Sequence, residues 1–416
     1  MRDDRRYKFL WMSSILLLLL LTACSKSSSE GGDEPDPNKP VLKIYIFPPD
    51  QPIVTRADDL GNVDASKEEN EIRSIHVWVF ERDESNLPTS LADSKLVGHV
   101  GLGNLTLSEA GTGEVTMEIT DDFAGRIMTS TTRPRVDVFV AANVTSANCG
   151  LSFDALTTNG ETKESDLEPI IGSSYFGVTS PITKVPSDGL PMSGVLKDQP
   201  ISGTSPVFRV GTSDKLANVQ LVRAVSKMRF IFCKSTSNLD EVAVKEIKLN
   251  GNVLPKEEYL FLTNDFKTVT PKWRIKGSEC EDEKTLVSIP SGTEIAKNNS
   301  PYSYSYDGKM TGQKYEDLIN EGVKNNELSD LGTFYLRESN KALKGTITYA
   351  ITPVGSTDAT EKPASYSMSI DGDFSRNHTW IVYGYFITSG DLEVRMVELI
   401  DWVGTENPEE DNLYNW

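Results

Sequence analysis

The chain has 416 residues, and 61 Asp and Glu against 42 Lys and Arg give it a formal net charge of −19. Hydrophobic residues make up 38% and aromatic residues 8%, which is the composition of a globular protein and excludes general disorder. The length favours two or three domains. The acidic balance argues against nucleic-acid binding, which needs clustered Lys and Arg. Four Cys are too few for a disulfide-dense scaffold, and three His leave little material for a His-rich metal site.

The first 23 residues have the pattern of an export signal. Four basic residues stand among the first eight, and an apolar run follows from Leu10 to Leu21. That run is shorter than the roughly 20 apolar residues that a transmembrane helix needs. It ends in Leu21-Thr22-Ala23-Cys24, which is similar to a bacterial lipobox. We therefore expect lipid attachment at Cys24; the alternative is a plain signal peptide followed by an unrelated Cys.

A tether and a strand follow the lipobox. Residues 24–40 are rich in Ser, Gly, Pro and acidic side chains, which cannot form a core, so they predict a flexible tether. Residues 41–47 alternate, with Leu42, Ile44 and Ile46 on one face. This pattern predicts a β-strand that buries one side, and Pro48-Pro49 ends it.

Residues 50–71 are polar and acidic and predict an exposed loop. Arg56 is the first basic residue in it and would be accessible to a protease with basic specificity. The acidic side chains of this loop lack the spacing of a calcium-binding EF-hand. We therefore interpret them as solvated charges and expect no metal site and no cofactor.

Short alternating segments dominate the rest of the chain. They are separated by Gly, Asn, Asp and Ser turns and predict antiparallel β-sandwiches. The clearest lie at 72–80, 115–119, 136–140, 347–351 and 392–396.

One segment departs from the β pattern, because apolar residues at helical spacing predict a short helix at 315–323. A polar, Gly- and Ser-rich region near 193–215 could divide the chain into two halves. After Cys24, the remaining Cys149, Cys233 and Cys280 allow at most one internal disulfide. Cys233 lies in an apolar segment and is expected to be a buried thiol.

Seven stretches together resemble the Bacteroidales fimbrillin family, the subunits of lipoprotein-derived pili of Porphyromonas and Bacteroides. The most specific is VQLVRAVSKMRF at 219–230, which is similar to a Leu-x-Arg-Ala-x-Ala-Lys strand of the family, with Ser226 in place of the usual Ala. The others are the lipobox at Cys24, Thr55-Arg56-Ala57, VDVFVAANV at 136–144, Pro191-Met192-Ser193-Gly194, SRNHTW at 375–380 and Asp401-Trp402.

The resemblance implies an all-β fold of two transthyretin-like, Greek-key β-sandwich domains and no enzymatic activity. The expected parts are a signal peptide at 1–23, a tether at 24–40, a removable first strand at 41–56, and domains at 57–212 and 213–416. Export would carry the lipoprotein to the outer membrane and the cell surface. An arginine-specific protease would then cut between Arg56 and Ala57 and release the strand that carries Leu42, Ile44 and Ile46.

The resemblance also implies assembly by donor-strand exchange with other pilin subunits, of this kind or of another. The strand lost from one subunit leaves a groove with unpaired backbone groups, which accepts a strand from the next subunit. The donor would come from the C-terminal region, with Leu392, Val394, Met396 and Trp402 as its apolar residues. Residues 403–416 are acidic and contain Pro408, so they offer little apolar alternation. A stalk, a tip and an accessory subunit all fit this scheme, and such pili mediate adhesion and biofilm formation through a host or bacterial surface ligand.

A different class of function remains open, namely a surface lipoprotein that never polymerises. Such a protein would keep residues 24–56 and act as a pilus anchor or bind a glycan or host ligand. A secreted hydrolase is the weakest alternative, since neither a Gly-x-Ser-x-Gly nor a His-Glu-x-x-His motif is present. Arg223 and Lys227 are expected to face solvent from one strand face. His76 is expected to be packed and His378 to form turn hydrogen bonds.

Overall fold

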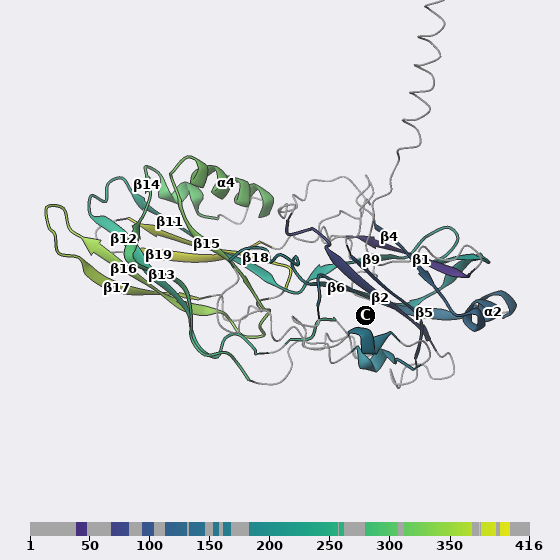
Figure 1. The fold of residues 1–416 in the computed structure, drawn as a ribbon. Helices are drawn as coiled ribbons and strands as arrows, with labels where there is room; N and C mark the ends of the chain where they lie inside the picture. The colour runs from purple at the N-terminus through teal and green to yellow at the C-terminus, as the bar shows by residue number, and fades with distance from the viewer. Residues whose placement is uncertain are drawn as a thin grey trace, which may run out of the picture. The chain divides into compact units, whose positions relative to one another are not determined.

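The computed structural model describes residues 39–47, 68–82, 94–103, 113–130, 133–145, 153–157, 161–167, 183–256, 258–261, 279–306, 312–367, 374, 376–387 and 392–399. Within these ranges the chain is mostly β-strand, with two α-helices and three short 3-10 helices (Figure 1). The strands form four sheets that pack in two pairs, so the all-β sandwich class predicted from the sequence is confirmed.

The first pair of sheets contains strands from residues 41 to 223, and we call it the first sandwich. Sheet 1 has the order β4-β1-β8-β7, with β9 also beside β1; sheet 2 has the order β10-β6-β5-β2-β3 (Figure 1). The bounds in sheet 1 are β1 Val41–Phe47, β4 Gly113–Glu118, β7 Ile201–Thr204, β8 Val207–Val210 and β9 Asn218–Gln220. The bounds in sheet 2 are β2 Ser74–Arg82, β3 Lys95–Gly103, β5 Arg135–Ala142, β6 Met192–Gln199 and β10 Val222–Arg223.

The core of the first sandwich lies between these two sheets. Alternate residues of each strand point inward, as the period of two of a β-strand requires. Sheet 1 contributes Ile44, Val115 and Phe208, and sheet 2 contributes Val77 and Val138, all without solvent exposure. Each such apolar side chain contributes roughly 1.5–3 kcal/mol of burial free energy.

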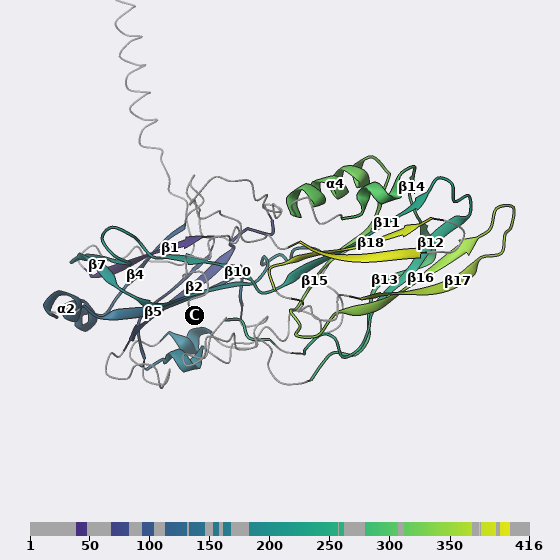
Figure 2. The same cartoon turned by 180° about the vertical axis from the view of Figure 1, so that it is seen from behind.

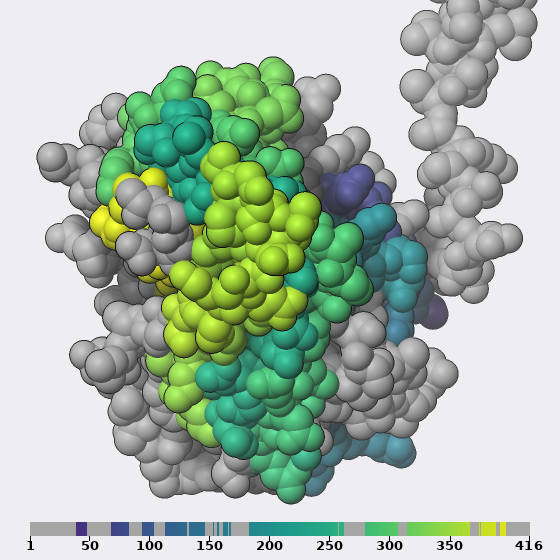
Figure 3. All heavy atoms as spheres, turned by 90° about the vertical axis from the view of Figure 1, so that its left-hand side faces the viewer, coloured from purple at the N-terminus to yellow at the C-terminus, as the bar shows by residue number. Residues whose placement is uncertain are grey.

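The second pair of sheets, the second sandwich, contains strands from residues 226 to 399. Sheet 3 has the order β14-β11-β18-β19, with β15 also beside β11; sheet 4 has the order β13-β12-β16-β17 (Figure 2). The bounds in sheet 3 are β11 Ser226–Ser235, β14 Lys297–Asn298, β15 Ser329–Leu336, β18 Thr379–Phe386 and β19 Leu392–Leu399. The bounds in sheet 4 are β12 Glu241–Leu249, β13 Lys284–Glu294, β16 Lys344–Thr352 and β17 Thr360–Ser367. Figure 3 shows the yellow-green surface of β16 and β17 beside the teal and green surface of β12 and β13.

A helix covers the outer face of sheet 3. This helix is α4, Gly312–Lys324 (Figure 1). Its Tyr315 and Ile319 belong to one buried cluster with Ile231, Cys233 and Tyr383. The 3-10 helix η4, Pro301–Tyr304, joins the same cluster. The helix expected at 315–323 is therefore confirmed, and so is the buried thiol, because Cys233 has no solvent exposure. Among the described residues, Cys233 and Cys280 do not form a disulfide.

The sheets are less uniformly antiparallel than the alternating pattern predicts. β11 runs parallel to β18 over eight residue pairs, and β1 runs parallel to both β8 and β9. Alternation reports which face of a strand is buried but not the direction of its neighbour, so a single sequence leaves the direction undetermined.

Two further features differ from expectation. The polar region near 193–215 does not separate two halves, because it forms β6, β7 and β8 of the first sandwich. The change of sheet falls later, between Arg223 and Ser226. The helix α2, Asp121–Thr129, was not expected; Thr120 caps it by accepting a hydrogen bond from the Phe123 N–H, and two Asp occupy its first turn.

Candidate functional site: the first strand and its groove

β1 lies inside sheet 1 and has hydrogen-bonded neighbours on both edges. It runs antiparallel to β4, from the pair Val41–Glu118 to the pair Ile46–Gly113. On its other edge it runs parallel to β8 over Val41–Lys43 and to β9 over Tyr45–Phe47. The backbone N–H of Leu221 donates to the Phe47 carbonyl at 2.9 Å. Removing β1 would therefore leave unpaired N–H and C=O groups along two facing strand edges.

The side chains of β1 alternate between a buried face and an outer face, as expected from the sequence. Leu42, Ile44 and Ile46 are fully buried in the first core. Their burial is worth roughly 1.5–3 kcal/mol per side chain. Without them, the inner face of sheet 1 would open into a groove lined by Val115, Met117, Phe208, Val210 and Val219.

The opposite face of β1 carries polar and aromatic side chains. Lys43 Nζ lies 2.5 Å from Glu114 Oε1 on β4. Burial alone would raise the pKa of Glu114, but hydrogen bonds from Lys43 and Tyr45 outweigh it and lower that pKa. The two side chains of this ion pair are 27% and 39% exposed, so the pair adds little to the stabilisation that the apolar face provides.

The segment that leads into β2 is fastened by a buried polar network. Arg223 Nε donates to the Glu69 carbonyl at 3.2 Å, and the Arg223 guanidinium also donates to Asn70. Lys227 Nζ lies 3.3 Å from Glu69 Oε2, and the Tyr335 hydroxyl donates to the other carboxylate oxygen. Burial first, and the Glu69 carboxylate second, raise the pKa of Tyr335, so this hydroxyl keeps its proton.

This network corrects one expectation. Arg223 is fully buried and Lys227 is 6% exposed, so neither faces solvent. They also belong to different strands, β10 and β11. Charged side chains are rarely buried unless they are paired, and the partner here, Glu69, is 158 residues away from Lys227 in the sequence. Spacing within one strand cannot reveal such a partner.

Residues from separate resemblance stretches meet in space. The Asn377 side-chain oxygen accepts hydrogen bonds from the Arg223 backbone N–H and from its Nη1, at 3.3 and 3.1 Å. Asn143, at φ +58°, donates to the carbonyls of Glu71 and Leu190, both at 2.8 Å. These amides satisfy buried backbone groups at turns, which is a structural role.

The two histidines behave largely as expected. His76 is half-buried and packs against Trp78, His99 and Phe153. Burial first, and His76 second, lower the pKa of His99 to about 4. His378 stands just before β18, and its carbonyl accepts from the Lys227 N–H.

The C-terminal residues assigned to a donor strand lie in two places. Leu392, Val394 and Met396 are in β19, which pairs with β18 over eight residues. Their half-buried side chains pack against the core of the second sandwich. Trp402 lies outside the described residues, and so do Cys24, Arg56 and Ala57. Their assignments stay predictions.

The described residues show neither a membrane-spanning helix nor a metal site. No helix among them is long and apolar enough to cross a membrane. No group of three or more His, Cys, Asp or Glu in the same ranges is arranged to hold a metal ion.

No protein-family model and no curated protein sequence matches the chain. Several solved structures are similar to it at low identity. A candidate cell adhesion protein from Bacteroides eggerthii is 14% identical, with 88% of this chain and 98% of that one covered and a TM-score of 0.42. The tip fimbrial protein Mfa3 from Porphyromonas gingivalis, with a C-terminal truncation, is 13% identical. The match covers 87% of this chain and 99% of that one, with a TM-score of 0.40. A fimbrial protein from Bacteroides vulgatus is 9% identical. The match covers 79% of this chain and 93% of that one, with a TM-score of 0.41. Because these TM-scores are below 0.5, the fold described above rests on this chain's own strands and cores.

Proposed function

We propose that the chain is a fimbrillin-type subunit of a cell-surface pilus. It is exported as a lipoprotein attached through Cys24, cut after Arg56 and assembled by donor-strand exchange. The observation that carries this proposal is the seating of β1, whose three aliphatic side chains are fully buried while both of its edges are hydrogen-bonded. A strand with one apolar face and two paired edges is the kind of element that another strand of the same pattern can replace.

The proposed cleavage site follows β1 in the sequence and precedes the Glu69 network. Arg56 stands nine residues after Phe47, where β1 ends. The described chain resumes at Glu68, and Glu69 is held by Lys227, Arg223 and Tyr335. A cut after Arg56 would thus free β1 from everything that follows it, while the new N-terminal segment stays attached at Glu69.

The packing of β19 favours a subunit that receives a strand without giving one. If Leu392, Val394 and Met396 entered another subunit, they would no longer pack against the core of the second sandwich, and part of that core would be exposed. Residues 403–416 have little apolar alternation to offer instead. The chain is therefore proposed as a tip or accessory pilin, at the cell surface and in contact with other pilin subunits. The resemblance implies two domains at 57–212 and 213–416; we propose two domains with the boundary near residue 224 instead, and the change in strand pairing after β10 supports that position.

A pilus anchor or a ligand-binding lipoprotein that never polymerises is the competing function. The two functions differ in the fate of residues 24–56, which the anchor or binder keeps. The N-terminus and mass of the protein from native cell surfaces distinguish them. A chain that starts at Ala57 in sheared filaments supports the pilin, whereas a lipidated Cys24 with β1 intact would overturn it.

The exchange step can be tested separately in solution. An arginine-specific protease should cut the chain after Arg56, and the Arg56→Ala variant should resist at that bond. The cut protein should then bind a peptide with the sequence of residues 41–47. The same peptide with Asp in place of Ile44 is the matched control and should not bind, because it would place a charge in the apolar groove. Equal binding of both peptides would contradict strand replacement.

A further inference from the structure

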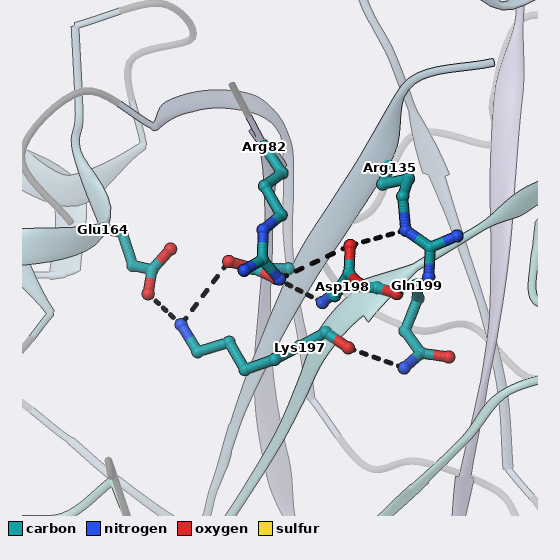
Figure 4. Close-up of polar contacts among 7 residues, drawn as sticks. Arg82, Arg135, Glu164, Lys197, Asp198 and Gln199 are labelled. Carbon is teal, nitrogen blue, oxygen red and sulfur yellow. Dashed lines mark hydrogen bonds and ion pairs between the residues drawn. The ribbon is translucent and has the colours of Figure 1, made fainter. Parts of the chain in front are cut away.

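A lysine lies between two carboxylates on the outer face of sheet 2. Lys197 in β6 places its Nζ 3.6 Å from Oδ2 of Asp137 in the neighbouring strand β5. The same Nζ bonds to Oε1 of Glu164, which belongs to the 3-10 helix η3, Glu164–Asp166. The three side chains are 7%, 4% and 1% exposed. Figure 4 shows Lys197 extended toward Glu164, with Arg82 nearby and the Arg135–Asp198 pair beside them.

An irregularity in the sheet brings Lys197 and Asp137 to the same face. The register of β5 against β6 shifts between Val136 and Val138, so Lys197 and Asp198 together lie opposite Asp137. Asp198 has φ +55°, and this left-handed residue turns the strand. Its backbone N–H donates to Asp137 Oδ1 at 2.6 Å, which fixes the carboxylate.

Apolar residues also pack beside the buried Lys197 side chain. Nζ lies 4.2 Å from the centre of the Phe139 ring, and Leu96 and Leu167 belong to the same buried cluster. Burial, opposed by Asp137 and reinforced by Arg82, lowers the pKa of Lys197 to about 8. A lysine in such a site supplies a neutral amine far more readily than one in water.

Glu164 has capacity for a proton. Its Oε1 contacts Lys197, and its Oε2 is buried with no hydrogen-bond partner among the described residues. A η3 backbone hydrogen bond, from the Leu167 N–H to the Glu164 carbonyl at 3.0 Å, holds the residue in place. The Leu96 N–H donates to the Thr162 carbonyl at 3.0 Å and ties this segment to β3.

We propose that Lys197 and Asp137 join in an intramolecular amide bond, with Glu164 as the proton carrier. The Glu164 carboxylate takes a proton from the Lys197 ammonium and passes it to Oδ2 of Asp137, and the freed amine adds to Cγ. The C–N bond forms, and the nitrogen gives a second proton to Glu164. The bond from Cγ to Oδ2 then breaks, and Oδ2 leaves as water with this second proton, which Glu164 passes on. An ammonium and a carboxylate thus become one amide and one water, with no change of oxidation state.

The contacts of Asp137 assign a role to each of its oxygens. Oδ1 accepts from the Asp198 N–H and lies 3.8 Å from Arg82 Nη1, so these groups stabilise negative charge on it during the addition. Oδ2 faces Lys197 and is the oxygen that leaves. Hydrolysis of the amide would need a water molecule at the same place. Because the buried site excludes solvent, this reverse reaction is slow once the released water has left.

The link would connect β5 to β6 covalently beside their hydrogen bonds. It does not depend on pilus assembly, since it would form in any folded copy of the chain. The two proposals can therefore fail independently.

Peptide mapping of the purified full chain by mass spectrometry tests the link. The expected result is a pair of peptides, containing Lys197 and Asp137, whose joint mass is lower by one water molecule. Separate, unmodified peptides at these positions would overturn the proposal and leave an ordinary buried ion pair.

Variants test the assigned roles in the same assay. Glu164→Gln should keep the two peptides separate, with circular dichroism confirming that the variant folds. Lys248→Arg alters a lysine in an exposed ion pair with Glu283 and is the matched control, which should remain fully linked. A normal yield of the link in Glu164→Gln would overturn the assignment of Glu164 as proton carrier.

Discussion

Lys227 of β11 and Glu69, which precedes β2, form an ion pair with 3.3 Å between Nζ and Oε2 and with side chains only 7% and 4% exposed. Arg223 and Tyr335 add hydrogen bonds to the same residue. The pair connects the segment before β2 of the first sandwich to sheet 3 of the second. Buried charges of this kind cost desolvation energy, so their value lies in fixing one arrangement of the chain.

Replacing Glu69 by Ala should lower the free energy of unfolding by about 3–5 kcal/mol, because Lys227 loses its carboxylate while it stays buried. Denaturant titration followed by tryptophan fluorescence measures the effect. Glu118→Ala is the control, since its partner Lys39 is 55% exposed and the loss should stay within about 1 kcal/mol. Similar losses in the two variants would contradict the stabilising role of the Glu69 network.

Within uncut protein, Ile44→Ala should lower the free energy of unfolding by about 2–5 kcal/mol, since the side chain is fully buried and leaves a cavity. Lys43→Gln on the outer face of the same strand should change it by less than about 1 kcal/mol. The comparison uses the Arg56→Ala chain, so that proteolysis does not remove β1. An Ile44 variant as stable as the parent would mean that β1 is not seated in solution.

β19 offers a test of the tip or accessory assignment. Val394→Asp should destabilise the isolated chain by about 1–3 kcal/mol, because the introduced polar group faces the core of the second sandwich. Arg395→Ser, on the exposed side of the same strand, should have an effect of about 0.5 kcal/mol or less. If Val394→Asp left the isolated chain unaffected but blocked filament growth, β19 would be a donor strand.

Part of this architecture follows from the sequence and part does not. The alternation in residues 41–47 predicts both the bounds of β1 and its buried face, and helical spacing finds α4. Period-based reasoning fails where a partner comes from far along the chain. The burial of Lys227 depends on Glu69, and the parallel register of β11 depends on β18, about 150 residues later. Local pattern contains no information about either.

The acidity of Glu258 should appear in the pH dependence of stability. Burial raises its pKa to about 8, Arg376 opposes the shift, and Glu338 adds to it. A raised pKa means that the folded state holds a proton that the unfolded state releases, so this group's contribution is lost as pH rises from about 4.5 to about 8. Glu258→Gln should therefore flatten the stability profile across that window. Parallel profiles for parent and variant, measured by thermal unfolding, would contradict the shift.

Cys233 should resist alkylation in the folded protein. Burial raises the pKa of its thiol to about 11, partly opposed by the Tyr383 hydroxyl, so almost no thiolate exists near pH 8. Iodoacetamide labelling, read out by peptide mass, should modify Cys233 only after denaturant is added. The half-buried Cys280 serves as the comparison in the same digest. Rapid labelling of Cys233 in native protein would show that the α4 layer opens.

The parallel neighbours of β1 impose an order on folding. The strand ends at Phe47, yet its partners on one edge, β8 and β9, occupy residues 207–220. Most of the first sandwich must therefore be synthesised before β1 can pair with strands on both of its edges. Pairing between segments so far apart in the sequence slows folding. During that wait the VLKIYIF segment is an exposed apolar strand and an aggregation hazard. We therefore expect folding to be more efficient when a chaperone binds the N-terminal segment until residue 220 has been synthesised.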